Sequence, residues 1–197
     1  MNLIISLSSL WSFFTNHPRI KSASIDLTDN LQLTSLGRIT SDLAEDIYCN
    51  TLELPKCGDN FFSFTHHDRY SNGKVIKTIK AEVKDHMPKM LVYDWNGDSK
   101  VGIGKTRIIA LRGTHSLQEW VGNFDCQEKN HTELGLNVEG YFHTDFAKVG
   151  KEIWNKYKDY ILKSDSPVVI TGHSRGGALA EVLHVIAKKE LLKQNSP

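Results

Sequence analysis

The chain has 197 residues, and its 24 Lys and Arg nearly balance its 23 Asp and Glu, which leaves a formal net charge of +1. Apolar residues make up 40% of the chain and charged residues 24%, a composition that is typical of a soluble globular protein and excludes disorder, collagen and coiled coil. The balanced charge provides no basic field, so we expect no nucleic-acid partner. The length predicts one domain with a substantial core.

The three cysteines are too few for a disulfide scaffold, and their odd number leaves at least one thiol without a partner inside the chain. Cys49 and Cys57 are near enough in sequence to bridge a short loop, but a reduced state fits equally well. No His and Cys cluster has the spacing of a zinc site, so we expect no metal ion. The compartment stays open, with an intracellular location slightly favoured over secretion.

The segment Leu3–Phe14 is apolar and rich in serine, but it is too short to span a bilayer. It lacks the basic start of a secretory signal, so we expect a buried or interfacial helix rather than a signal peptide. On this basis residues 1–38 form an apolar and irregular N-terminal segment, and residues 39–197 form the main domain.

Apolar spacing and turn residues predict the elements that follow. They are a helix over Ile39–Cys49 with Ser41 as its N-cap, strands over Lys74–Val83, Met90–Tyr93 and Arg107–Leu111, an amphipathic helix over Tyr141–Leu162, a strand over Val168–Ile170, a sharp turn over Gly172–Gly177, and a helix over Ala178–Leu192. The strand Val168–Ile170 is apolar at every position, which indicates a central strand that is covered on both faces. The alternation of strands and helices predicts an α/β fold.

A G-x-S-x-G motif, Gly172-His173-Ser174-Arg175-Gly176, joins that strand to the last helix. A serine at such a junction occupies a tight and strained turn, where glycines on either side remove side chains that would clash. Its hydroxyl is then exposed beside a helix N-terminus, which favours developing negative charge. The motif predicts that Ser174 is a nucleophile, and the alternative is a tight turn with a structural role only.

The run Gly-His-Ser-Arg-Gly-Gly-Ala-Leu-Ala, residues 172–180, resembles the nucleophile elbow of the class 3 lipases, a fungal-type branch of the α/β-hydrolases. Three other segments are similar to motifs of this family and follow in its order: Ile108–Thr114, an apolar strand that ends in Arg-Gly-Thr; Ser116–Trp120, with Glu119 where the family has Asp; and His143–Phe146, with Asp145 where the family has Gly. The resemblance begins near Ile39. It implies a three-layer α/β-hydrolase sandwich with a mostly parallel sheet, here lacking its C-terminal strands.

The resemblance implies a serine carboxylic-ester hydrolase that acts on lipid acyl esters, of triacylglycerol lipase or phospholipase type. Ser174 would be the nucleophile, Gly172 and Gly176 the elbow glycines, and the backbone N–H groups of Thr114 and Arg175 the oxyanion hole. One such donor is typically worth ~3 kcal/mol in the transition state. The chemistry needs no cofactor. The implied partners are a lipid or acyl-ester substrate and, through it, interfacial contact with a membrane.

The base and acid of a triad are not found after Ser174. In α/β-hydrolases they follow the serine in the chain, yet no Asp follows it here and the only His is His184. Helical rise places His184 ~15 Å from the serine and Glu181 ~10 Å, too far for contact. Three other histidines are weak candidates for the base: His115, His143 and His173. Base and acid therefore stay unassigned.

Two explanations fit this gap. The chain is either the front part of a longer lipase or a complete but degenerate protein that binds lipid or a protein partner without catalysis, and the clean stop of its last helix slightly favours a chain that ends there. Either form would leave a sheet edge open, which predicts self-association. A different hydrolase chemistry, such as peptide or thioester cleavage, is a third alternative, although the Arg-Gly-Thr strand favours the lipase branch.

Overall fold

The computed structural model describes residues 4–7, 25–26, 28–47, 71–80, 88–114, 128–130 and 141–194. Its elements are β1 (Ile4–Leu7), α1 (Asn30–Asp46), β2 (Gly73–Ile79), β3 (Met90–Trp95), β4 (Thr106–Leu111), β5 (Glu128–Asn130), β6 (Tyr141–His143), α4 (Thr144–Leu162), β7 (Val168–Gly172) and α5 (Arg175–Gln194). The expectations for Cys49, Cys57, His115 and Ser116–Trp120 lie outside the described residues.

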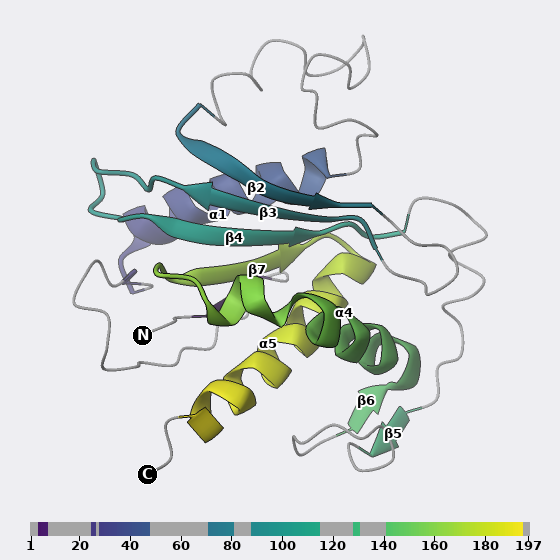
Figure 1. The fold of residues 1–197 in the computed structure, drawn as a ribbon. Helices are drawn as coiled ribbons and strands as arrows, with labels where there is room; N and C mark the ends of the chain where they lie inside the picture. Colours follow the sequence, from purple (N-terminus) through teal and green to yellow (C-terminus); the bar gives the residue numbers. More distant parts are fainter. Residues whose placement is uncertain are drawn as a thin grey trace, which may run out of the picture.

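A five-stranded sheet in the order β1-β7-β4-β3-β2 forms the centre of the fold (Figure 1). β1, β7 and β4 pair in parallel, whereas β3 runs antiparallel to both β4 and β2. The sheet is therefore mixed, and the mostly parallel character that we expected holds only for the half that contains the G-x-S-x-G motif. The short strands β5 and β6 form a separate antiparallel pair.

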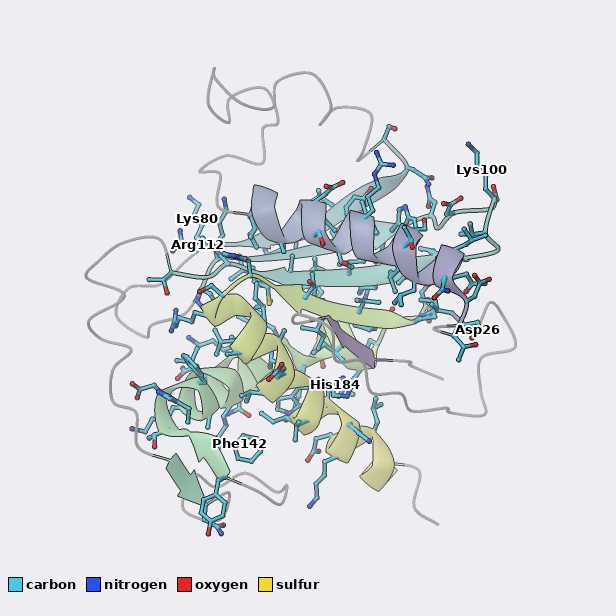
Figure 2. The ribbon with its side chains drawn as sticks, turned by 180° about the vertical axis from the view of Figure 1, so that it is seen from behind. Asp26, Lys80, Lys100, Arg112, Phe142 and His184 are labelled. Carbon is cyan, nitrogen blue, oxygen red and sulfur yellow. The ribbon has the colours of Figure 1, made fainter. Side chains whose placement is uncertain are left out.

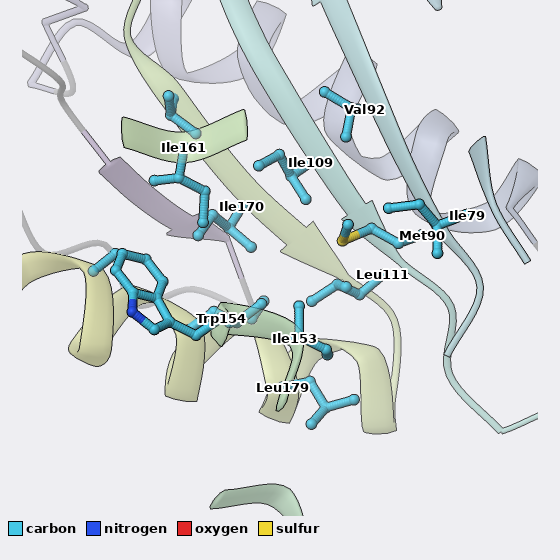
Figure 3. Close-up of a cluster of buried hydrophobic side chains, with 14 of the residues drawn as sticks. Ile79, Met90, Val92, Ile109, Leu111, Ile153, Trp154, Ile161, Ile170 and Leu179 are labelled. Atoms are coloured by element: carbon cyan, nitrogen blue, oxygen red, sulfur yellow. The ribbon is translucent and has the colours of Figure 1, made fainter. Parts of the chain in front are cut away.

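Helices cover both faces of the sheet, which gives the three layers of the expected sandwich. One face packs against α4 and α5 through a core that contains Met90, Val92, Ile109, Leu111, Val168 and Ile170 (Figure 3). The other face packs against α1 through a core that contains Leu91, Tyr93, Trp95, Ile108, Ala110 and Val169. Neighbouring residues of each strand thus enter opposite cores. The prediction that Val168–Ile170 is a central strand covered on both faces is confirmed.

Helix α1 begins nine residues before the start that the sequence predicted. Its N-terminus is capped by Asp29, whose carboxylate accepts a hydrogen bond of 2.8 Å from the backbone N–H of Leu31. Ser41 is therefore inside the helix, and its prediction as N-cap was wrong. The first turns carry Leu31, Leu33 and Leu36, but Leu31 is 68% exposed and Gly37 interrupts the pattern, so apolar spacing did not reveal where the helix begins. An aspartate cap can set the start of a helix without any apolar signal.

The expected helix Tyr141–Leu162 is shorter at its start. Residues Tyr141–His143 form strand β6, and α4 begins at Thr144. The prediction was wrong for these three residues. Phe142 continues the apolar spacing of the helix, but it belongs to a strand that pairs with β5, and a pattern read locally does not reveal a partner in another segment. The helix that remains packs closely on α5, since a Cβ on Gly150 would meet the side chain of Val182.

The N-terminal segment contains a strand where we expected a helix. Ile4–Leu7 pairs in parallel with β7 from Ile4↔Val168 to Leu7↔Thr171. This pairing joins two segments more than 160 residues apart, and no local pattern predicts it. The boundary expected between residues 38 and 39 also falls inside the continuous helix α1, so it does not coincide with the end of an element. The remainder of Leu3–Phe14 lies outside the described residues.

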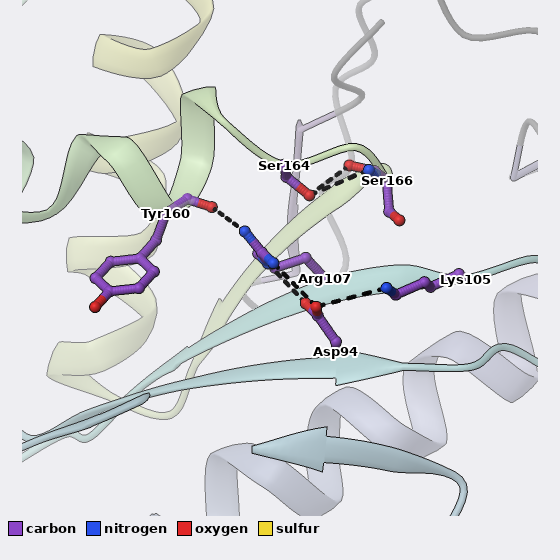
Figure 4. A network of polar contacts seen from close by, with 6 residues as sticks. All are labelled: Asp94, Lys105, Arg107, Tyr160, Ser164 and Ser166. Carbon is purple, nitrogen blue, oxygen red and sulfur yellow. Dashed lines mark hydrogen bonds and ion pairs between the residues drawn. The ribbon is translucent and has the colours of Figure 1, made fainter. Parts of the chain in front are cut away.

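A largely buried ion pair fixes the amino-terminal end of β4 to its neighbours (Figure 4). The Arg107 guanidinium donates to both carboxylate oxygens of Asp94 on β3, at 2.7 Å and 2.9 Å, and also to the carbonyl of Tyr160 near the end of α4, at 3.2 Å. Hydrogen bonding to Asp94 raises the pKa of Arg107 above its ordinary value. The network therefore links β3, β4 and α4 at the end of the sheet opposite to the carboxyl end of β4.

Candidate active site

The junction between β7 and α5 adopts a strained backbone turn. Ser174 has φ 55°, and it is the only non-glycine residue with a positive φ among the residues that the structure describes. The left-handed region is costly for a residue with a Cβ, and such strain is concentrated at functional positions. The first helical turn holds the serine from both sides: Gly176 N–H donates to the carbonyl of His173 at 3.0 Å, and Gly177 N–H donates to that of Ser174 at 2.9 Å.

The two glycines of the motif are required by close approach of backbone to backbone. A Cβ on Gly172 would overlap the carbonyl group of Gly176, so the chain could not fold back over itself at the turn. A Cβ on Gly176 would overlap the carbonyl oxygen of Leu111 and lie 3.0 Å from the carbonyl carbon of Arg112. The start of α5 therefore rests directly on the end of β4 (Figure 2).

This contact brings the Arg-Gly-Thr segment and the serine to one edge of the sheet. β4 and β7 are parallel and in register, with Leu111 opposite Gly172, so the chain leaves both strands at the same edge. Thr114 follows β4 by three residues, Ser174 follows β7 by two, and Arg175 opens α5. The structure thus assembles the predicted nucleophile and the two predicted oxyanion donors at this edge.

The Ser174 side chain is exposed, and its hydroxyl makes no hydrogen bond with a described residue. None of the described imidazoles is therefore hydrogen-bonded to the Ser174 hydroxyl. His173 is exposed beside it. His143 is half-buried and stacks on Phe146, with ring centroids 4.4 Å apart. These positions leave the base and the acid unassigned, as the sequence did.

His184 lies inside the protein, on α5. The side chain is 5% exposed, and neither of its ring nitrogens has a hydrogen-bond partner among the described residues. Burial, with a smaller contribution from the positive charge of Lys188, lowers the pKa of His184 from 6.5 to about 4. The imidazole is neutral at neutral pH, and the residue belongs to the packing of α5 on the sheet. Glu181, on the same helix, is exposed.

Lys89 is a residue at this edge that the sequence did not single out. It precedes β3, is 8% exposed, and accepts a backbone hydrogen bond of 2.9 Å from Arg112 through its carbonyl oxygen. Burial and the nearby positive charge of Arg112 lower the pKa of the Lys89 ammonium. A lysine in front of an apolar strand is common and gives no signal in the sequence. The side chain of Lys89 and that of Arg112, the arginine of the Arg-Gly-Thr segment, are thus both buried at this place.

Within the described ranges, no group of three or more His, Cys, Asp or Glu side chains is arranged to hold a metal ion. The helices described here include none with the length and apolarity needed to cross a membrane.

Comparison with known proteins agrees with this geometry. Residues 108–197 match the model of the class 3 lipase family. A curated relative, the secreted mono- and diacylglycerol lipase 1 of Fusarium solani, is 29% identical over 107 residues, which cover 47% of this chain and 31% of the relative. The chain therefore spans about a third of that relative's length.

Two solved lipase structures share the fold. The triacylglyceride lipase of Rhizomucor miehei superposes with a TM-score of 0.54 at 22% identity, over 85% of this chain and 58% of that one. The nonglycosylated LIP2 lipase of Yarrowia lipolytica superposes with a TM-score of 0.52 at 17% identity, over 82% of this chain and 55% of the other.

The chain shares the α/β-hydrolase fold of these two lipases. The similarity to class 3 lipases that the motifs predicted is confirmed over residues 108–197, from Ile108 on β4 onward.

Proposed function

We propose that the chain provides the nucleophile and the oxyanion hole of a serine ester hydrolase that acts on lipid acyl esters. The observation that carries the proposal is the left-handed backbone of Ser174, which presents an exposed hydroxyl between the end of β7 and the start of α5. A polypeptide retains such strain where the surrounding contacts impose it. Here these contacts are the close approach of the Gly172 backbone to that of Gly176, and of the Gly176 backbone to that of Leu111.

The chemistry follows from this arrangement. The Ser174 oxygen attacks the carbonyl carbon of the ester, and a base accepts the hydroxyl proton. Negative charge then develops on the former carbonyl oxygen, which the backbone N–H of Arg175 and that of Thr114 stabilise together with the N-terminus of α5. The tetrahedral intermediate expels the alcohol, which takes the proton back, and water later releases the fatty acid. We assign the base and the acid to no described residue.

The proposed substrate class is that of acylglycerols. The Fusarium solani relative is a mono- and diacylglycerol lipase and the Rhizomucor miehei neighbour a triacylglyceride lipase by name, which supports a glycerol ester rather than a peptide or a thioester. Since the chain spans only part of each of these proteins, the choice between head groups is left to a substrate panel with matched leaving groups.

Hydrolysis of p-nitrophenyl butyrate by the full chain tests the proposal. The matched variants are Ser174→Ala and Ser99→Ala, because Ser99 is also exposed but lies in the turn that follows β3. We expect hydrolysis by the wild type and by Ser99→Ala, and none above background by Ser174→Ala. Equal hydrolysis by Ser174→Ala would contradict the proposal. A folded wild type that hydrolyses nothing would favour the alternative, a lipase-like domain without catalysis.

A further inference from the structure

The outermost strand, β2, carries a cationic and apolar surface that the ester chemistry does not use. Lys74, Lys77 and Lys80 are all exposed, and within Ser71–Lys80 there is no acidic residue. None of the three lysines forms an ion pair with a described residue. In a chain whose net charge is only +1, three uncompensated positive charges over seven residues form a local field.

Two large apolar side chains lie within the same strand. Val75 is 43% exposed and Ile76 is 37% exposed, which makes them two of the four large hydrophobic residues exposed among the described residues. Ile76 has no partner on β3 and forms a bulge, because its neighbours Val75 and Lys77 pair with the adjacent residues Tyr93 and Val92. Val75 shares the α1 face of the sheet with its partner Tyr93, whereas Lys77 shares the α4–α5 face with Val92, so apolar and cationic side chains flank this edge strand on its two faces.

The strand also has a fixed relation to the serine. β2 and β4 both run antiparallel to β3, so their carboxyl ends lie at the same edge of the sheet as the G-x-S-x-G turn. Figure 2 labels Lys80 and Arg112 at this common edge. A surface that contacts β2 near Lys80 therefore lies along the edge from which the Ser174 hydroxyl is exposed.

We propose that β2 is a docking strand that binds the surface of an anionic lipid membrane, with Lys74, Lys77 and Lys80 on the head groups and Val75 and Ile76 in the interfacial layer. Charge complementarity and the apolar pair select this occupant. Proteins that bind single-stranded nucleic acid stack the bases on aromatic side chains, which this stretch lacks. Edge-to-edge pairing with a protein strand is opposed by lysines on an edge strand and by the bulge. The choice of a lipid surface rests on the proposed function, but the binding itself does not need catalysis.

Cosedimentation with vesicles of diether phospholipids tests the proposal without hydrolysis, because these lipids contain no acyl ester. Vesicles with 30% phosphatidylserine head groups are compared with purely phosphatidylcholine vesicles. A lysine near an anionic surface changes the partition coefficient about fivefold, so the triple variant Lys74→Gln, Lys77→Gln, Lys80→Gln should bind roughly a hundredfold more weakly. A second variant, Val75→Ser with Ile76→Ser, should bind about tenfold more weakly, since it removes the apolar contact alone.

The matched control is the triple variant Lys100→Gln, Lys148→Gln, Lys158→Gln, which removes the same charge from exposed positions outside β2. It should bind as the wild type does, and Ser174→Ala should also bind normally. Equal loss in both lysine triples would overturn the proposal in favour of unspecific charge attraction. Equal binding of the wild type to both kinds of vesicle would also overturn it. If the wild type is a dimer in gel filtration and the β2 lysine triple variant is a monomer, pairing of β2 between two copies of the chain would replace the docking proposal.

The β2 variants should still hydrolyse the soluble ester p-nitrophenyl butyrate at the wild-type rate. A wild type that binds anionic vesicles but hydrolyses no ester would count against the proposed function alone. Loss of vesicle binding by Ser174→Ala would mean that the serine turn, not β2, contacts the lipid, and this would overturn the docking proposal alone.

Discussion

Replacing Ser174 by glycine should stabilise the protein relative to replacement by alanine. Both changes remove the hydroxyl, so they differ only in the Cβ, which sits on a backbone with φ 55°. The left-handed conformation costs a residue with a Cβ about 1–2 kcal/mol. Glycine offsets part of this gain because it loses about 0.5–1 kcal/mol more conformational entropy on folding. The net expectation is that Ser174→Gly is more stable than Ser174→Ala by about 0.5–1 kcal/mol.

Urea unfolding of the two variants measures this difference, provided that both transitions have the same slope. A chain of this length should show a difference of about 2–3 °C in Tm as well. Ser41 provides the matched control pair, because it is exposed inside α1, where φ is negative. There the order reverses, and Ser41→Gly should be less stable than Ser41→Ala by about 1 kcal/mol. The same order at both positions would refute the claim that the turn stores backbone strain.

Three further predictions concern the contacts around the site. Gly176→Ala should lower the unfolding free energy by about 2 kcal/mol and kcat/KM for a soluble ester by about a hundredfold, since its Cβ overlaps the carbonyl of Leu111 and pushes α5 from β4; wild-type kinetics would contradict this account. Asp94→Leu should cost about 3 kcal/mol in urea unfolding because it leaves the Arg107 guanidinium buried without its partner, and a double variant with Arg107→Met should recover most of that loss; no recovery would mean that packing, not charge, explains the cost. The pKa of His184 is lowered from 6.5 to about 4, so protonation favours the unfolded chain. The unfolding free energy should therefore fall by about 2 kcal/mol from pH 7 to pH 5, and His184→Leu should largely remove this fall. An unchanged pH dependence in that variant would show that other groups cause it.

The sequence predicted the part of the fold whose signals are local. An all-apolar strand, two obligatory glycines and a run of apolar residues at helical spacing define β7, the serine turn and α5 within a few residues of their observed bounds. The same was true of β4, where Arg107–Leu111 was expected and Thr106–Leu111 observed.

The parts that the sequence missed depend on partners far along the chain or on caps. β1 is defined by its pairing with β7, and β6 by its pairing with β5. The first residue of α1 is set by one aspartate cap, Asp29, which the apolar spacing does not reveal. A pattern that is read locally has no access to such partners.

The candidate site divides in the same way. Ser174, Gly172 and Gly176 follow from a motif whose geometry is enforced within a few residues. That Thr114 shares an edge with the serine follows only from the parallel register of β4 and β7, which a sequence suggests but does not fix. Lys89 has no signal in the sequence, because only its burial beside Arg112 distinguishes it from other lysines.

Labelling with a fluorophosphonate, followed by peptide mass spectrometry, tests the central claim most directly. The reagent forms a covalent bond with an activated serine, so it reports the nucleophile itself rather than a product of turnover. The account predicts one adduct on the wild-type chain, on the peptide that contains Ser174, no adduct on Ser174→Ala, and an unchanged adduct on Ser99→Ala. An adduct that persists in folded Ser174→Ala, or a folded wild type that takes up no label, would contradict the assignment of Ser174 as the nucleophile.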